Sequence, residues 1–230
     1  MRIVPVIDLQ GGIVVHARRG ERADYAPLRS PLVDGCEPVA VARALCAAGQ
    51  TSTLYVADLD ALAGAPVDVD TLAALSAVAE LWVDAGATTR KRAAALASAG
   101  VARNVVGTES LGAGASWDTN ATLARALSID LRDGRLISPR ADLAGRNPAA
   151  AAPLVTALGV SELLVIDLAR VGSGAGPPLG AVAELAAALP GFAIYAGGGV
   201  RSDDDLRALE AVGAAGALVA TALHEGRITP

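Results

Sequence analysis

The sequence predicts an α/β fold, namely a closed (β/α)8 TIM barrel built from two repeated half-barrels. Short runs rich in Val, Ile and Leu alternate along the chain with Ala- and Leu-rich segments of helical period, which favours parallel strands covered by helices. The alternation occurs eight times in 230 residues, and this length is typical of one such barrel. A strand pattern that ends in Asp also recurs in both halves of the chain.

Each predicted strand is a short aliphatic run followed by a polar or glycine-containing segment. The first, RIVPVID, is followed by Gly-Gly, and the sixth, ELLVID, also ends in Asp. The eight predicted strands are 2–8, 52–58, 81–84, 104–107, 126–130, 162–167, 192–197 and 216–220.

The predicted helices lie between these strands, and several of them end at a Gly, which is a common C-terminal signal. The segment 116–125 has little apolar period, and Pro148 and Pro153 obscure the start of the next helix. The predicted helices are 37–49, 71–79, 89–100, 116–125, 151–159, 179–189 and 202–213.

The composition excludes several classes of protein. Hydrophobic residues make up 53% and aromatic residues 3%, so we expect a core of Ala, Val and Leu. A net charge of −5 gives no basic surface for nucleic acid or an anionic membrane. Cys36 and Cys46 have no metal-ligand spacing, and neither a membrane span nor a signal peptide is evident. We therefore expect a cytoplasmic protein with reduced thiols.

An internal repeat divides the chain into half-barrels of about 1–122 and 123–230. The pattern Ile-Asp-Leu-x-x-Gly surrounds both Asp8 and Asp130. In a closed barrel this doubling places the ends of the first and fifth strands opposite one another, so Asp8 faces Asp130. Further pairs keep the same order, namely Asp58 with Asp167, Gly86 with Gly199, and Gly107-Thr108 with Ala220-Thr221.

Barrel active sites form at the strand ends, and the residues Asp8, Asp58, Asp130 and Asp167 each end a predicted strand. A single such Asp either caps the following loop or acts on a ligand. The matched pair Asp8 and Asp130 favours function, because two carboxyl groups can serve as base and acid if their environments differ. The sequence leaves open which is which. We predict Asp8 and Asp130 as catalytic, and Asp58 and Asp167 as substrate-binding.

A phosphate site is predicted in the second half. Gly197, Gly198 and Gly199 follow a strand and open a helix, so backbone N–H groups can converge on an anion; a tight turn is the alternative. Ala220 and Thr221, after the eighth strand, belong to the same predicted site. Ser202 and Asp205 form a predicted capping box at the helix start.

The first half differs at the corresponding place. Asp84 stands where the second half has Gly197, and a carboxylate repels an anion. Either this half binds no phosphate, or Asp84 points away and Gly86, Gly107 and Thr108 contribute. Asp84 is then a candidate for binding another part of the substrate.

The loop after the first strand carries His16, Arg18, Arg19 and Arg22, which either contact an anionic ligand or form a solvated loop. We predict His16 and Arg19 as substrate-binding and His224 as structural. The sequence contains no Ser/His/Asp triad, zinc site, Walker loop or dinucleotide fingerprint. No metal site is predicted.

Several motifs together resemble one family over the whole chain: PVIDLQGGIVV, VADLDA, VVGT, IDLRDGR, DLARVG, AGGGVRS and ALHEG. The chain resembles the two-fold-repeat barrels of histidine biosynthesis, namely phosphoribosylformimino-aminoimidazole carboxamide ribotide isomerase and the cyclase of imidazole glycerol phosphate synthase. The resemblance implies an Amadori-type aldose-to-ketose isomerisation with Asp8 as general base and Asp130 as general acid. It also implies no metal, no cofactor and, for the isomerase, a substrate with a phosphate at each end.

The sequence departs from the family pattern around one end of the site. Where the family has a glycine cluster, this chain has Asp84-Ala85-Gly86, and where the family has Arg after the first strand, it has His16. Three family dipeptides are also replaced: Gly-Arg by Ala220-Thr221, Gly-Trp by Arg140-Ala141, and Thr-Asp by Ile166-Asp167. These departures suggest a substrate that differs from that of the histidine-pathway isomerase. The pattern is similar to isomerase-like paralogues of methanogenic archaea and methylotrophic bacteria, which are associated with tetrahydromethanopterin-linked C1 metabolism.

We therefore expect an isomerase-like enzyme for a phosphorylated sugar or ribosyl phosphate. The first alternative is the histidine-pathway isomerase itself, and the second is a non-catalytic barrel that binds a phosphometabolite or a partner protein. The third is a lyase or condensing enzyme in which Asp84 receives a substrate amine and Lys91 or a neighbour takes part. The expected partner is a small phosphorylated substrate, with no nucleic acid and no membrane; an oligomer is compatible with the sequence.

Overall fold

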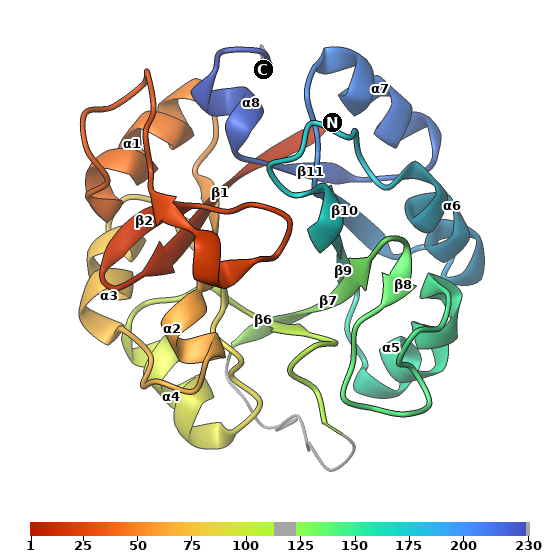
Figure 1. Cartoon of the computed structure of the whole chain (residues 1–230). Coiled ribbons are helices and arrows are strands. Elements are labelled where there is room, and N and C mark those ends of the chain that lie inside the picture. The colour runs from red at the N-terminus through yellow and green to blue at the C-terminus, as the bar shows by residue number, and fades with distance from the viewer. Residues whose placement is uncertain (113–122, 229–230) are drawn as a thin grey trace.

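The computed structural model describes residues 1–112 and 123–228. In this part, eight parallel strands form a ring, and β11 pairs with β1 to close it (Figure 1). The predicted TIM-barrel fold class is confirmed. The barrel strands are β1 (Arg2–Gln10), β4 (Thr53–Asp58), β5 (Glu80–Asp84), β6 (Arg103–Gly107), β7 (Ala124–Arg132), β9 (Glu162–Asp167), β10 (Ala193–Gly197) and β11 (Gly216–Val219).

Helices surround the ring and bury leucines against it; Leu45, Leu75 and Leu96 are fully buried. The first helix begins where the Glu37 carboxylate accepts hydrogen bonds from the N–H groups of the first turn. The main helices are α1 (Pro38–Ala48), α3 (Val69–Ser76), α4 (Arg90–Ser98), α5 (Ala152–Leu158), α6 (Leu179–Ala188) and α7 (Asp203–Ala211), with short helices α2 (Leu59–Leu62) and α8 (Thr221–His224) and single turns η1 (Arg22–Asp24), η2 (Pro148–Ala151) and η3 (Leu168–Arg170).

The helix predicted at 116–125 lies mainly outside the described residues. Its end is wrong, because Ala124 and Arg125 belong to β7 and pair in parallel with Arg103 and Asn104 of β6. Pairing within the barrel determines the structure of Ala124 and Arg125 more strongly than local helix propensity does.

Short antiparallel strands extend two barrel strands beyond the ring. Strand β2 (Ile13–His16) folds back on β1, and β8 (Arg135–Leu136) folds back on β7. Both turns have two residues with positive φ, Gly11-Gly12 and Asp133-Gly134, as tight hairpins require. The sequence analysis did not predict these hairpins. They occur in both halves, although the division into half-barrels at about residue 122 stays a prediction.

Aromatic and basic side chains fill the N-terminal end of the barrel. Trp82 is fully buried and meets Tyr195 edge to face, with ring centroids 4.9 Å apart. The guanidinium groups of Arg2 and Arg103 lie 5.2 and 4.8 Å from the centroid of the Trp82 ring. These side chains fill the N-terminal end, whereas the cavity described below opens at the C-terminal ends of the strands.

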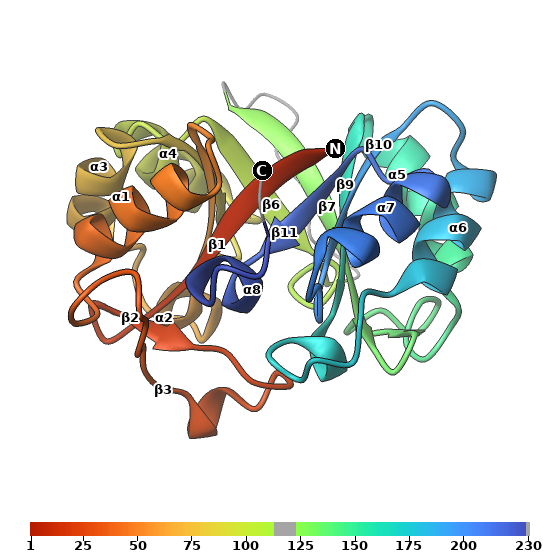
Figure 2. The same cartoon turned by 90° about the horizontal axis from the view of Figure 1, so that it is seen from above.

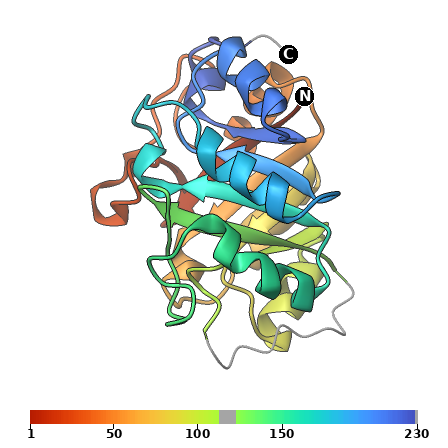
Figure 3. The ribbon, with the colours of Figure 1, turned by 90° about the vertical axis from the view of Figure 1, so that its right-hand side faces the viewer.

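The segment 17–35 crosses the C-terminal end of the barrel and includes η1 and β3 (Ala26–Pro27). It projects from the ring at this end, as Figure 2 and Figure 3 show. The Arg19 N–H donates to the Val171 carbonyl over 2.9 Å, and Arg132 donates to Glu21 over 3.1 Å. These bonds hold the segment against the second half of the barrel, over the cavity described below.

Candidate active site

A cavity of about 420 Å³ opens at the C-terminal end of the barrel. Residues from both halves line it, together with residues of the crossing segment 17–35. The polar and glycine residues on its wall include Asp8, His16, Arg18, Arg22, Tyr25, Tyr55, Asp84, Glu109, Asp130, Gly172, Ser173, Gly174, Gly197, Gly198, Gly199, Arg201, Thr221 and His224.

Asp8 points into this cavity from β1. Ala57 of β4 pairs with Asp8 on one side and with Asp84 of β5 on the other, so these two acids lie at one level of the barrel and on its inner face. The Asp8 carboxylate has no hydrogen-bond partner among the described residues. Burial raises its pKa to about 7, although the nearby Arg22 guanidinium opposes this shift.

Asp130 lines the same cavity from β7, but its carboxylate is fixed. Ser128 Oγ donates to Oδ1 over 2.6 Å, and the Glu109 N–H donates to Oδ2 over 3.1 Å. Thr108 Oγ1 accepts from the Asp130 N–H over 3.0 Å, which orders the strand end. Burial and the charge of Glu109 raise the Asp130 pKa to about 7 against these hydrogen bonds. Both acids therefore titrate near neutral pH.

Gly107 allows Asp84 and Asp130 to approach each other. A Cβ atom on Gly107 would lie 3.3 Å from Asp84 Oδ2 and would overlap Asp130 Oδ2. Asp84 is 3% exposed, and its Oδ1 accepts from the Gly86 N–H over 3.1 Å. Burial, followed by the charge of Asp130, raises the pKa of Asp84 well above its ordinary value. Gly86, Gly107 and Thr108 thus position carboxyl groups, and none of them lies on the cavity wall.

Glu109 and Arg22 complete the acidic end of the cavity. Arg22 of η1 donates a hydrogen bond to Glu109, which lies two residues after the end of β6. Sequence reasoning did not select Glu109, which lies beyond the strand end, whereas the selected aspartates are the last residues of predicted strands. Tyr25 and Tyr55 also line this end, and burial followed by the charge of Asp8 raises the Tyr25 pKa to about 12. The Tyr25 phenol therefore remains a neutral hydrogen-bond donor.

The glycine loop after β10 lies on the opposite wall. Gly198 and Gly199 have φ of 94° and 81°, and Cβ atoms there would lie 2.6 and 2.5 Å from the carbonyl oxygens of Asp167 and Gly176. Only glycine fits such a close backbone approach. Ala220 and Thr221 join the same wall, so the structure brings together all residues predicted for the second-half phosphate site.

The start of α7 differs from the prediction. Ser202 occupies the N-cap position, but its side chain makes no capping hydrogen bond, so the predicted capping box is wrong. The reason is that the Asp205 carboxylate accepts from the Arg201 N–H over 2.8 Å and pairs with the Arg201 guanidinium, with Nη2 2.8 Å from Oδ1.

Three predicted binding residues lie off the cavity wall. Asp58 accepts from the N–H groups of Ala61 and Asp68 over 3.0 and 3.3 Å. Asp167 accepts from the N–H groups of Asp133, Gly134 and Ala169, and Arg19 is held through its own backbone N–H. Asp58 and Asp167 therefore cap the loops that follow their strands, which is the alternative that the sequence analysis left open.

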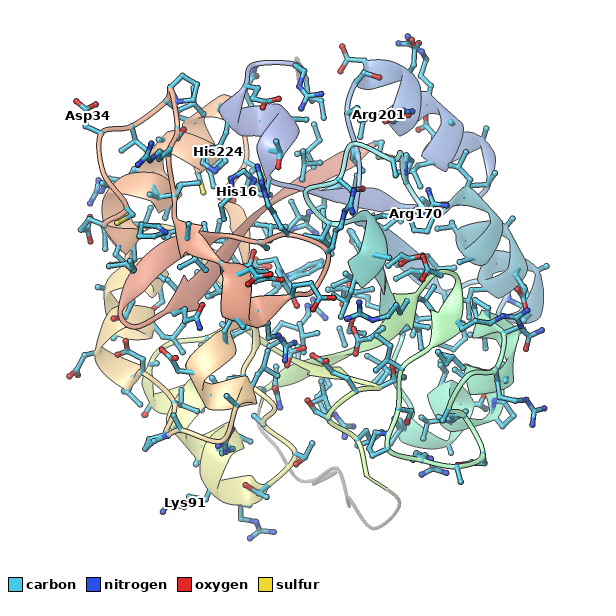
Figure 4. The ribbon with its side chains drawn as sticks, viewed as in Figure 1. His16, Asp34, Lys91, Arg170, Arg201 and His224 are labelled. Atoms are coloured by element: carbon cyan, nitrogen blue, oxygen red, sulfur yellow. The ribbon has the colours of Figure 1, made fainter. Side chains whose placement is uncertain are left out.

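The two histidines lie close together beside the glycine loop side of the cavity (Figure 4). His224 Nδ1 is hydrogen-bonded to Ser30 Oγ at 2.8 Å, and burial lowers the His224 pKa to about 4. Lys91 is exposed on the outer side of α4 and points away from the barrel. The position of Lys91 therefore argues against its part in the lyase or condensing-enzyme alternative.

The fold and the site define an α/β-barrel protein with an acid-lined cavity at the C-terminal strand ends. A family model for "Histidine biosynthesis protein" matches residues 2–229, and the chain belongs to this family. Within residues 1–112 and 123–228, no group of three or more His, Cys, Asp and Glu side chains is placed to hold a metal ion. No helix in the same part is long and apolar enough to span a membrane.

The sequence similarity to the relatives extends along nearly the whole chain. Proteins of Rubrobacter xylanophilus and Halobacterium salinarum are 35% and 32% identical, and each alignment covers 99% of this chain and 93% of the relative. Both are named 1-(5-phosphoribosyl)-5-((5-phosphoribosylamino)methylideneamino)imidazole-4-carboxamide isomerase. A Methanocaldococcus jannaschii protein described as uncharacterized is 28% identical, over 98% of this chain and 94% of its own.

Proposed function

We propose that this protein is an isomerase of the aldose–ketose kind that acts on a phosphorylated sugar or ribosyl phosphate. One observation carries the proposal: Asp8 and Asp130 line a single cavity whose opposite wall is the glycine loop 197–199. The names of the relatives support the reaction class. A cavity that only bound a phosphometabolite would need the loop but not two acids that titrate near pH 7.

The two acids divide the proton transfers of an Amadori-type reaction. Asp130, in its protonated form, donates to the ring oxygen of an aminoaldose, which opens the ring to an imine. Asp8, ionised and without a protein partner, removes the proton from C2, and the enamine that forms tautomerises to the aminoketose. Each positioned group typically contributes about 10²–10⁴-fold in rate. The assignment of base and acid follows the family resemblance.

The acidic end of the cavity argues for one phosphate instead of two. The isomerases named above act on a molecule with two phosphoribosyl groups, whereas Asp84, Glu109 and Asp130 occupy the first-half end here. We therefore propose a divergent paralogue, linked to C1 and tetrahydromethanopterin metabolism as the resemblance implies. The second candidate function is that of the histidine-pathway isomerase. The 35% identity to the isomerase of Rubrobacter xylanophilus favours this candidate.

Solvent exchange at C2 tests the reaction class without knowledge of the product. Aldose phosphates, beginning with ribose 5-phosphate, are incubated with the protein in D2O, and loss of the C2–H signal is followed by NMR. We expect exchange with the wild type and at least about 10²-fold slower exchange with Asp8→Asn. Phosphate binding without exchange of any aldose phosphate would support the non-catalytic alternative.

Complementation separates the two candidate substrates. A bacterial strain without the histidine-pathway isomerase is transformed with this protein, and we expect no growth without histidine. Restored growth that Asp8→Asn abolishes would contradict the divergent assignment. A known isomerase expressed in the same vector is the positive control.

A further inference from the structure

His224 lies on the cavity wall, one helical turn after Thr221. Both residues belong to α8, and both line the cavity together with the glycine loop 197–199. Residues three apart on a helix lie on the same face, so the two side chains are neighbours. The sequence analysis predicted His224 as structural, and the reaction proposed above does not use it. Its two ring nitrogens nevertheless have different surroundings.

Nδ1 of His224 faces the crossing segment 17–35. It is hydrogen-bonded to Ser30 Oγ at 2.8 Å, and the same Oγ accepts from the Leu32 N–H over 3.1 Å. Among the described residues, the Ser30 hydroxyl has no other acceptor for its own proton. All of these groups are therefore paired within the protein only when the Ser30 hydroxyl donates to an unprotonated Nδ1.

The charge state of the ring completes the assignment of its proton. Burial, followed by the charge of His16, lowers the pKa of His224 to about 4, whereas the charge of Glu225 opposes this shift. The imidazole is therefore neutral near pH 7 and carries a single proton. Because Nδ1 accepts from Ser30, that proton lies on Nε2.

Nε2 is the ring nitrogen that the protein leaves unpaired. It has no hydrogen-bond partner among the described residues, and it is not one of the buried polar atoms in that part of the chain that lack a partner. Since His224 is 7% exposed and lines the cavity, the accessible side of its ring faces the cavity. The protein thus presents a neutral N–H donor on the wall of the proposed phosphate site.

We propose that His224 binds the phosphate of the substrate through Nε2–H, and that Ser30 is a positioning residue that fixes the tautomer needed for this bond. The inference rests on the proposed function for the location of the phosphate. Phosphate oxygens are strong acceptors, and hydrogen bonds to a charged group are stronger than those between neutral groups. Because Ser30 belongs to segment 17–35, the donor is fixed in this form only while the segment lies across the barrel.

Two substitutions that each keep one ring nitrogen test the role of His224. The amide nitrogen of Gln reaches close to the position of Nε2, whereas that of Asn reaches only the position of Nδ1. Binding of inorganic phosphate and of ribose 5-phosphate is measured by calorimetry at pH 7. We expect His224→Asn to weaken binding about tenfold or more, as for the loss of one hydrogen bond to a charged group, and His224→Gln to retain most of the affinity.

Ser30→Ala tests the positioning role. Without the Ser30 hydroxyl we expect both tautomers of His224, and phosphate binding that weakens in proportion to the fraction of Nε2–H lost. Imidazole ¹⁵N NMR distinguishes the two nitrogens, and the wild type should show His224 protonated on Nε2 alone. The spectrum of His224→Asn identifies the His224 signals, because the chain has only two histidines. Ser98→Ala, at an exposed serine that ends α4 away from the cavity, is the matched control and should change neither measurement.

The outcomes separate this inference from the proposed function. Equal phosphate affinity of the wild type and His224→Asn would overturn the inference alone, as would a wild-type proton on Nδ1 or an equal loss of affinity in both His224 variants. A wild type that binds neither inorganic phosphate nor ribose 5-phosphate would overturn the proposed phosphate site as well. Thermal unfolding shows whether each variant is folded, and Ser30→Ala with the wild-type ¹⁵N spectrum carries the test if His224→Asn does not fold.

Discussion

Asp84 and Asp130 extend their carboxyl groups over the same face of Gly107, from strands on either side of it. The second half of the barrel has a glycine loop where Asp84 stands in the first. Burial, followed by the charge of Asp130, raises the pKa of Asp84. In the proposed function, the glycine loop 197–199 binds the phosphate and the end of the cavity beside Asp84 does not.

Replacement of Gly107 should separate the two acids. Gly107→Ala places a methyl group on Asp130 Oδ2, so we expect a loss of about 1–3 kcal/mol in the free energy of unfolding, measured with urea. Gly180→Ala in α6 is the control, because its Cβ meets open space; helix propensity predicts a gain of at most about 1 kcal/mol there. Equal effects of the two substitutions would contradict the packing.

Stability should fall as pH rises toward 7. The folded-state pKa of Asp8 is raised from 3.8 to about 7, so the folded protein holds a proton that the unfolded chain releases. By linkage, this group makes the free energy of unfolding decrease between these two pH values and then level off. Urea unfolding across the range should show a shallower decrease in Asp8→Asn. An unchanged slope would contradict the raised pKa.

Arg22 should control the titration of the acids. Its charge lowers the Asp8 pKa, so Arg22→Gln should move that pKa further above its value of about 7, as followed by carboxyl ¹³C NMR. Arg132→Gln removes an Arg that pairs with Glu21 and does not line this cavity, and it should leave the Asp8 titration in place. A shift of the same size in both variants would indicate a general charge effect.

His224 should stay neutral well below neutral pH. Burial lowers its pKa from 6.5 to about 4, and only two histidines occur in the chain, so its imidazole resonances are readily followed by NMR. Because the folded state resists protonation, His224 makes the protein less stable as pH falls from 6.5 toward 4. Titration near pH 6.5 would mean that His224 is exposed to solvent.

Periodicity predicted the barrel and the strand ends because a buried parallel sheet imposes strong local patterns. Asp8 and Asp130 were recognisable as cavity residues from their places at strand ends, and Asp84 from its place in the internal repeat. Asp58 carries the same signal, yet its carboxylate caps α2, and no local feature distinguishes the two roles. Side-chain direction depends on which backbone N–H groups the fold brings near, and these come from distant segments.

Glu109 is a cavity residue that the sequence analysis did not select. Its partner Arg22 lies in a segment that reaches the acidic end only after the loop crosses the barrel. The single letter at position 109 therefore gives no sign of the ion pair. The raised pKa values of Asp8 and Asp130 also could not be predicted from the sequence, because burial is the largest cause of both shifts.

The number of anion sites tests the central claim most directly. Crystals soaked separately in inorganic phosphate and in ribose 5-phosphate should show one phosphate in the cavity, bound at Gly197, Gly198 and Gly199. The acidic end beside Asp84 should contain none. A second phosphate held near Asp84 and Gly107, or an empty glycine loop at saturating ligand, would contradict the account.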